Sequence, residues 1–79
     1  MGSVLDKEGW LTDLSGWMVS PLSRYNVGDG MAKALCGRML ATGRSFAACR
    51  VKGMSNYAYL VFLDKQGQVR WGRLTKEDA

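Results

Sequence analysis

The sequence contains no histidine and only two cysteines among its 79 residues. Without histidine the chain lacks the commonest general base and the commonest zinc ligand, and it cannot form a Ser–His or Cys–His catalytic pair. Cys36 and Cys49 are too few for a disulfide framework and too far apart for a metal or redox motif. We therefore expect both cysteines to be small buried hydrophobic residues.

Other absences exclude further classes. No apolar run approaches the ~20 residues of a membrane span, and residues 1–13 carry three acids and no long apolar core, unlike a signal peptide. Gly28-Asp29-Gly30 precedes a helical pattern but lacks the spacing of a dinucleotide or P-loop motif. The sequence thus predicts a cytoplasmic protein without enzymatic activity, cofactor, metal or membrane association.

Acidic residues are scarce in the middle of the chain. Residues 24–76 hold ten basic side chains against Asp29 and Asp64, a net charge of +8, whereas residues 1–23 carry a net charge of −2. We therefore interpret residues 1–79 as one small domain, with an acidic amphipathic N-terminal segment at 1–23 and a basic body at 24–76. The electric field of a basic body favours anionic partners, either nucleic acid or an acidic protein surface.

The residues that are present predict two helices. The first pattern repeats the pair Gly-Trp and has apolar residues at helical spacing, namely Trp10, Leu11, Leu14, Trp17 and Met18. It predicts a helix over Asp6–Met18 with both tryptophans on one stripe, and a hairpin that turns at the glycines is the alternative. The second helix is expected over Met31–Thr42, with Asp29 as its N-cap and Gly43 as a left-handed stop.

After Gly43 the pattern changes to strands, at Ser45–Lys52, Asn56–Asp64 and Gln68–Thr75. The expected fold is therefore α+β, with two N-terminal helices followed by a three-stranded antiparallel β-meander packed on the second helix.

Register decides which side chains share a face of this meander. A three-residue loop at Lys65-Gln66-Gly67 pairs Tyr59 with Arg73, and a first turn at 53–56 pairs Arg50 with Tyr59. One face is then mostly aliphatic and lies under the second helix. The other face collects the six residues that we predict to bind a partner, namely Arg50, Lys52, Tyr57, Tyr59, Trp71 and Arg73.

Two functions fit such a face. One is a small protein that docks stoichiometrically on a larger acidic protein or nucleoprotein complex and inhibits or adapts it by occluding its surface. The alternative is a single-stranded RNA- or DNA-binding domain, in which bases stack on the rings and phosphates meet the cations. A structural role for the rings, covered by the first helix, also fits the pattern.

A second set of residues forms a candidate secondary interface, namely Trp10, Trp17, Lys33, Gly37 and Arg38. The tryptophans are either a core anchor or an interface hot spot. The small-residue stripe through Gly30, Ala34, Gly37 and Ala41 either packs under the N-terminal loop or meets a second copy in a homodimer.

Overall fold

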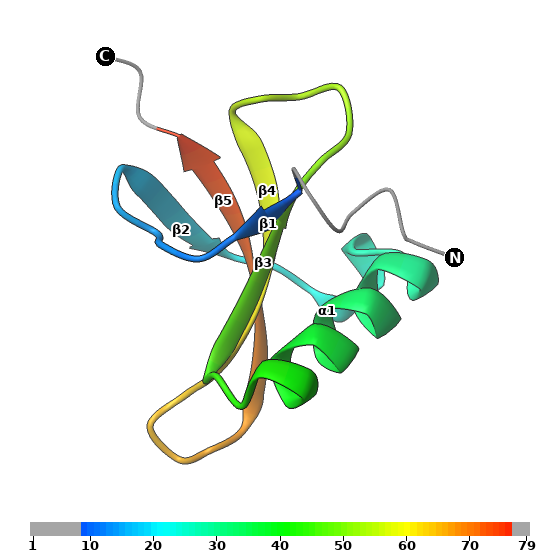
Figure 1. Cartoon of the computed structure of the whole chain (residues 1–79), viewed down its shortest axis with the longest axis vertical. Helices are drawn as coiled ribbons and strands as arrows, with labels where there is room; N and C mark the ends of the chain where they lie inside the picture. The colour runs from blue at the N-terminus through cyan, green and yellow to red at the C-terminus, as the bar shows by residue number, and fades with distance from the viewer. Residues whose placement is uncertain (1–8, 77–79) are drawn as a thin grey trace.

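The computed structural model describes residues 9–76, which form one α-helix, one 3₁₀-helix and five strands (Figure 1). In chain order the elements are β1 (Trp10–Leu11), β2 (Trp17–Pro21), η1 (Arg24–Asn26), α1 (Asp29–Thr42), β3 (Phe46–Arg50), β4 (Tyr57–Leu63) and β5 (Val69–Lys76). The strands form one antiparallel sheet in the order β1-β3-β4-β5-β2. The predicted fold of two helices and a three-stranded meander is therefore wrong, because the structure has one α-helix and a five-stranded antiparallel sheet.

The predicted N-terminal helix is wrong. Its described part contains β1 and the first two residues of β2, while residues 6–8 lie outside the described range. The alternative hairpin is also wrong, because β1 pairs with β3 and β2 pairs with β5, at opposite edges of the sheet. A helical spacing of apolar residues is a weak signal over so short a segment, and pairing with two strands from elsewhere in the chain overrides it.

The short connection between β1 and β2 forces the sheet to curl. A flat five-stranded sheet separates its edges by about 19 Å, a span that the five residues 12–16 cover only when they are almost fully extended. The N–H of Trp17 instead donates to the carbonyl of Leu14 at 3.0 Å, which folds the connection into a turn. The two edge strands are therefore drawn toward each other around a concave face.

Apolar side chains fill both faces of this curled sheet. On the concave face the buried core consists of Ala48, Ala58, Leu60 and Leu74, and side chains of the β1–β2 segment, including Leu14 and Trp17, pack against it. On the convex face α1 packs against β3 and β4 (Figure 1). The core there consists of Val27, Ala32, Leu35, Met39, Ala47, Cys49 and Val61.

The one α-helix largely follows its sequence pattern. Ala32, Leu35 and Met39 recur at the spacing of one helical face and are buried against the sheet. Gly43 ends α1 in the left-handed conformation (φ 65°), as predicted. Two details are corrected: Gly28, not Asp29, is the N-cap, and Leu40 points outward with 80% of its surface exposed.

The β4–β5 turn is held by local hydrogen bonds, which explains why its register is predictable. One carboxylate oxygen of Asp64 accepts hydrogen bonds from the backbone N–H groups of Gln66 and Gln68, both at 2.9 Å. The other oxygen accepts one from Nε of Arg70 at 2.9 Å. Gly67 takes the positive φ (79°) that closes the turn.

Replacement of Leu74 by alanine tests the concave core. Leu74 is fully buried, so the truncation should cost about 2–5 kcal/mol of unfolding free energy, comparable with the whole stability of ~5 kcal/mol expected for a domain of this size. Leu40→Ala is the control, because this exposed side chain should change the stability by less than about 0.5 kcal/mol. Urea unfolding followed by tryptophan fluorescence measures both, and equal effects would contradict the two-sided core.

The turn at Asp64 predicts a dependence of stability on pH. The hydrogen bond from the Gln68 N–H, followed by that from Arg70, lowers the pKa of Asp64 below its ordinary value of 3.8. A lowered pKa contributes stability above pH 3.8 that is lost as the pH falls through the folded-state pKa. Urea unfolding at pH 7 and below pH 4 should show a smaller acid loss in Asp64→Asn than in the wild type. An unchanged acid slope would rule out this contribution.

Candidate protein-binding surface

The structure brings four of the six predicted partner-binding residues to one face of the sheet. Tyr59 lies opposite Arg73, and Val61 lies opposite Trp71, as the predicted register requires. Because side chains alternate along a strand, Tyr57 faces the same side as these residues. The predicted pairing of β4 with β5 is therefore confirmed.

This face is the convex one on which α1 packs, which corrects the prediction that the helix covers the opposite, aliphatic face. Tyr59 and Trp71 are half-buried against the core beneath α1. Tyr57 is also half-buried, and Arg73 is exposed. The rings thus contribute to the fold through one part of their surface and stay accessible through another.

Arg50 and Lys52 do not join the other four residues. Arg50 lies opposite Ala58, on the concave face, and Lys52 lies in the turn after β3. The turn is one residue longer than predicted, because the N–H of Val51 donates to the carbonyl of Tyr57 at 2.9 Å and leaves 52–56 as the loop. That single residue moves Arg50 to the other face.

The position of Arg50 is unusual for an arginine. Its Nε is buried and has no hydrogen-bond partner within residues 9–76. A guanidinium N–H without an acceptor is a cost that folded proteins rarely accept. Arg50 therefore remains a candidate for contact with a partner, but it lies on the concave face, apart from the other four residues.

Arg24 completes the convex surface, and sequence reasoning did not find it. Its guanidinium carbon lies 5.6 Å from the centre of the Trp71 ring, and that of Arg73 lies 5.4 Å from the centre of the Tyr57 ring. Arg24 belongs to η1, far from β4 and β5 in sequence, so no local pattern connects it with Trp71. We call this surface the aromatic–basic patch; it consists of Arg24, Tyr57, Tyr59, Trp71 and Arg73.

The described acidic side chains are engaged by neighbours of their own. Asp29 accepts from Arg24 at 3.1 Å and lies 3.7 Å from Lys33, and Asp64 is paired with Arg70. The third, Asp13, accepts hydrogen bonds from Ser15. Across 9–76, the ion pairs of the structure therefore leave Arg73 in the patch without an acidic partner.

The two N-terminal tryptophans do not share a stripe, which corrects the predicted arrangement. Trp10 pairs in register with Cys49 and packs on the convex core. Trp17 pairs with Lys76 and packs on the concave core. Each indole therefore anchors one edge strand. The two indoles pack on opposite faces of the sheet because a turn lies between the two strands.

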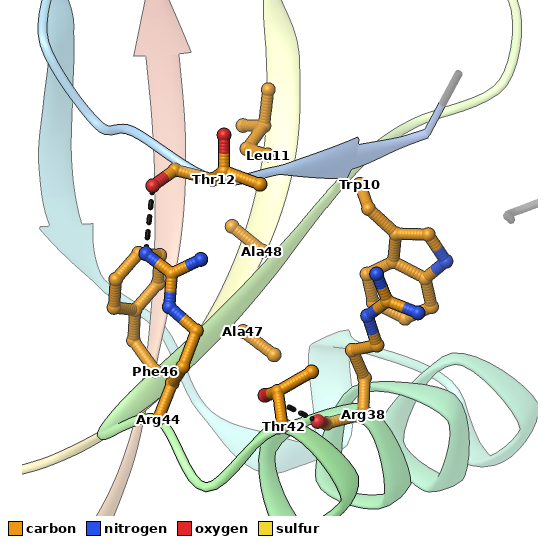
Figure 2. Close-up of a pocket in the computed structure, with 9 residues that line it drawn as sticks. All are labelled: Trp10, Leu11, Thr12, Arg38, Thr42, Arg44, Phe46, Ala47 and Ala48. Atoms are coloured by element: carbon orange, nitrogen blue, oxygen red, sulfur yellow. Dashed lines mark hydrogen bonds between the residues drawn. The ribbon is translucent and has the colours of Figure 1, made fainter. Parts of the chain in front are cut away.

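Arg38, a secondary-interface candidate, lies beside a small pocket together with Arg44 (Figure 2). Arg38 stacks over the Trp10 ring at 5.2 Å, and Arg44 stacks over Phe46 at 4.6 Å and donates to the carbonyl of Thr12 at 2.8 Å. The pocket has a volume of about 30 Å³, room for little more than a water molecule. These contacts join the β1 edge to α1 and β3.

The remaining candidates, Lys33 and Gly37, lie exposed on α1. A Cβ built on Gly30 or on Gly37 would meet no atom within 4 Å, so in the described chain nothing packs on the small-residue stripe at these two positions. The N-terminal loop therefore does not cover it there. A homodimer through this stripe stays a prediction.

Cys49 is fully buried, and this burial raises the pKa of its thiol. Between residues 9 and 76 no three His, Cys, Asp or Glu side chains gather as metal ligands. Over the same range, no helix has the length and apolar character to cross a membrane.

No known protein family, characterised protein or solved structure matches this chain. A function for this chain must therefore be inferred from the chemistry of its surface alone.

The two cysteines should differ in reactivity. Cys36 is half-buried, whereas Cys49 is fully buried with a raised thiol pKa, and the thiolate is the reactive form. An aromatic disulfide reagent should modify one thiol per native chain and both thiols in urea. The Cys36→Ser variant should show no fast native reaction, and equal rates for the two native thiols would contradict this burial.

Proposed function

We propose that this chain is a non-enzymatic cytoplasmic binding protein that docks on an acidic surface of a larger protein or nucleoprotein complex through the aromatic–basic patch. The observation that carries the proposal is the pairing of exposed Arg73 with the half-buried Tyr57 ring. A ring contact restricts a flexible guanidinium and still leaves its N–H donors free for a carboxylate.

The composition of the patch supports a protein partner. Tryptophan, tyrosine and arginine are the residue types that dominate the energetics of protein interfaces. Met18, on the strand next to β5, is 51% exposed and lies on the same face of the sheet, and methionine is also enriched at interfaces. The patch thus combines apolar anchors with one cation, Arg73, that has no acidic partner among residues 9–76.

The same contacts favour a protein over single-stranded nucleic acid. Base stacking requires a free ring face, but Arg24 lies over Trp71 and Arg73 lies over Tyr57. A stacked base would have to displace each guanidinium at a cost of about 0.5–1 kcal/mol. Carboxylates that approach the guanidinium edges need no such displacement.

Docking of this kind acts by occlusion. A chain of this size covers a site on a larger partner without any chemical step, as a stoichiometric inhibitor or adaptor does. Its strength would depend on ionic strength, since exposed charges are screened within about 8–10 Å at physiological salt.

Charge reversal at Arg73 tests the proposal. Arg73→Glu should weaken the complex at least about tenfold, because it removes a cation and places a like charge opposite an acidic partner. Lys65→Glu is the matched control: it makes the same change in net charge at an exposed position in the β4–β5 turn. Affinity capture from the native host, with and without nuclease, measures retention, and circular dichroism checks folding.

The nuclease separates the two functional classes. A partner that is retained after nuclease treatment, lost with Arg73→Glu and kept with Lys65→Glu supports docking on protein. If the partner disappears after nuclease treatment, and the chain also binds a fluorescent oligo(dT) or oligo(U) strand in a salt-sensitive way, the function is nucleic-acid binding and not docking on protein. Equal retention by both variants would remove the patch from the interface.

A further inference from the structure

The side chain of Arg50 differs from that of every other arginine in the chain. Each of the others lies against a carboxylate, a backbone carbonyl or an aromatic ring, namely Arg24, Arg38, Arg44, Arg70 and Arg73. Within residues 9–76 the Arg50 guanidinium has no hydrogen bond, ion pair or ring contact. Its N–H donors are therefore available to an acceptor from outside the described chain.

Partial burial makes these free donors costly. The Nε atom of Arg50 is enclosed by protein and has no acceptor, and the residue as a whole is half-buried. The terminal nitrogens Nη1 and Nη2 are not enclosed, so a ligand can reach the guanidinium through its outer fork. Because the positive charge is shared by all three nitrogens, an anion at this fork offsets the charge of the whole group.

A hollow of about 340 Å³ lies beside Arg50, within the size range of ligand-binding pockets. It lies at the end of the sheet where the loop 52–56 joins β3 to β4 (Figure 1). Its lining residues come from this loop, from the end of β3 and from the residue before β1, namely Gly9, Arg50, Val51, Gly53, Met54 and Ser55. The lining thus contains one cation and no acidic side chain.

The loop supplies further donors at the hollow. The N–H of Met54 donates to the carbonyl of Val51 at 3.0 Å, and Gly53 takes a positive φ (83°) in the turn that this bond closes. In the described chain the N–H groups of Gly53 and Ser55 and the Ser55 hydroxyl donate to no acceptor. A Cβ built on Gly53 would meet no atom within 4 Å, so a ligand can approach the backbone there.

The basic side chains around the loop have no described acid beside them. Lys52 belongs to the loop and is exposed, and the N–H of Lys76 donates to the carbonyl of Asn56 at 3.0 Å, which brings the end of β5 to the same place. The acidic side chains of 9–76 are engaged by other residues, namely Asp13 by Ser15, Asp29 by Arg24 and Asp64 by Arg70. A dianion at the hollow gains more from this positive field than a monoanion does.

We propose that Arg50 and the loop 52–56 bind a phosphoryl group. A phosphate monoester presents three terminal oxygens and about two negative charges, so it can accept from the arginine fork on one side and from the N–H and hydroxyl groups of the loop on the other. A carboxylate has fewer oxygens and a single charge, and it leaves part of these donors unpaired. Free phosphate and a phosphorylated side chain offer the same chemistry. The site lies apart from the aromatic–basic patch and does not depend on the docking function.

Titration of the ¹⁵N-labelled chain at constant ionic strength tests the site. The probes are inorganic phosphate and two acetylated, amidated alanine peptides with either phosphoserine or glutamate at the centre. The Nε–H signal of Arg50 and the backbone amides of Gly53 and Ser55 should shift and saturate with phosphate and with the phosphoserine peptide. The glutamate peptide should bind at least about tenfold more weakly, because it has less charge and fewer oxygens.

Two substitutions with the same change in net charge separate the site from general attraction. Arg50→Met keeps an unbranched side chain but removes the fork, so the affinity for phosphate should fall at least about tenfold. Arg73→Met removes a cation from the patch instead and should leave the affinity unchanged. Ser55→Ala, at an exposed loop position, should weaken binding about threefold through the lost hydroxyl. Circular dichroism checks folding, and if Arg50→Met does not fold, Ser55→Ala and the signals of the unaltered chain decide.

The outcomes distinguish the phosphoryl site from its alternatives. Unshifted Arg50, Gly53 and Ser55 signals at millimolar phosphate, or equal losses in Arg50→Met and Arg73→Met, would overturn the proposal. A glutamate peptide that binds as tightly as the phosphoserine peptide would replace it by a carboxylate site. If the phosphoserine peptide binds at least about tenfold more tightly than inorganic phosphate, the source is a phosphorylated side chain, and equal affinities indicate free phosphate. Phosphate binding that survives Arg73→Glu shows that the site is independent of docking through the patch.

Discussion

Burial on both faces of the sheet is the constraint on which the rest of the structure depends. A chain of 79 residues buries only about 60% of the surface that its unfolded form exposes, so it cannot leave one side of a largely apolar sheet in water. One helix covers β3 and β4 on the convex face. The concave face is closed by curling, with Leu14 and Trp17 packed over its core. The pairing of β1 and β2 at opposite edges makes this curl possible.

Local chemistry explains which parts of this fold are readable in the sequence. Asp64 and Gly67 determine the β4–β5 turn within a few residues, so the pairing of Tyr59 with Arg73 could be predicted. The end of α1 at Gly43 is equally local. The edge strands are two and five residues long and pair with distant partners, so the apolar spacing of residues 10–18 could not distinguish them from a helix.

The candidate surface was predictable to the same extent. Tyr57, Tyr59, Trp71 and Arg73 share a face because their hairpin register follows from its turn. Arg50 is on the other face because the preceding turn has one residue more than its sequence suggests. The contact of Arg24 depends on how η1 meets β5, and such tertiary contacts leave no periodic signal.

Basic and aromatic side chains thus have two roles in this protein. The rings pack on the core, and the cations that lie over them form a charged surface. The most direct test is backbone hydrogen exchange of the chain alone and in complex with its captured partner. We predict slowed exchange in β4 and β5 around the aromatic–basic patch, and unchanged exchange at Gly30 and Gly37 on the outer face of α1. Slowed exchange confined to α1, with β5 unchanged, would contradict it.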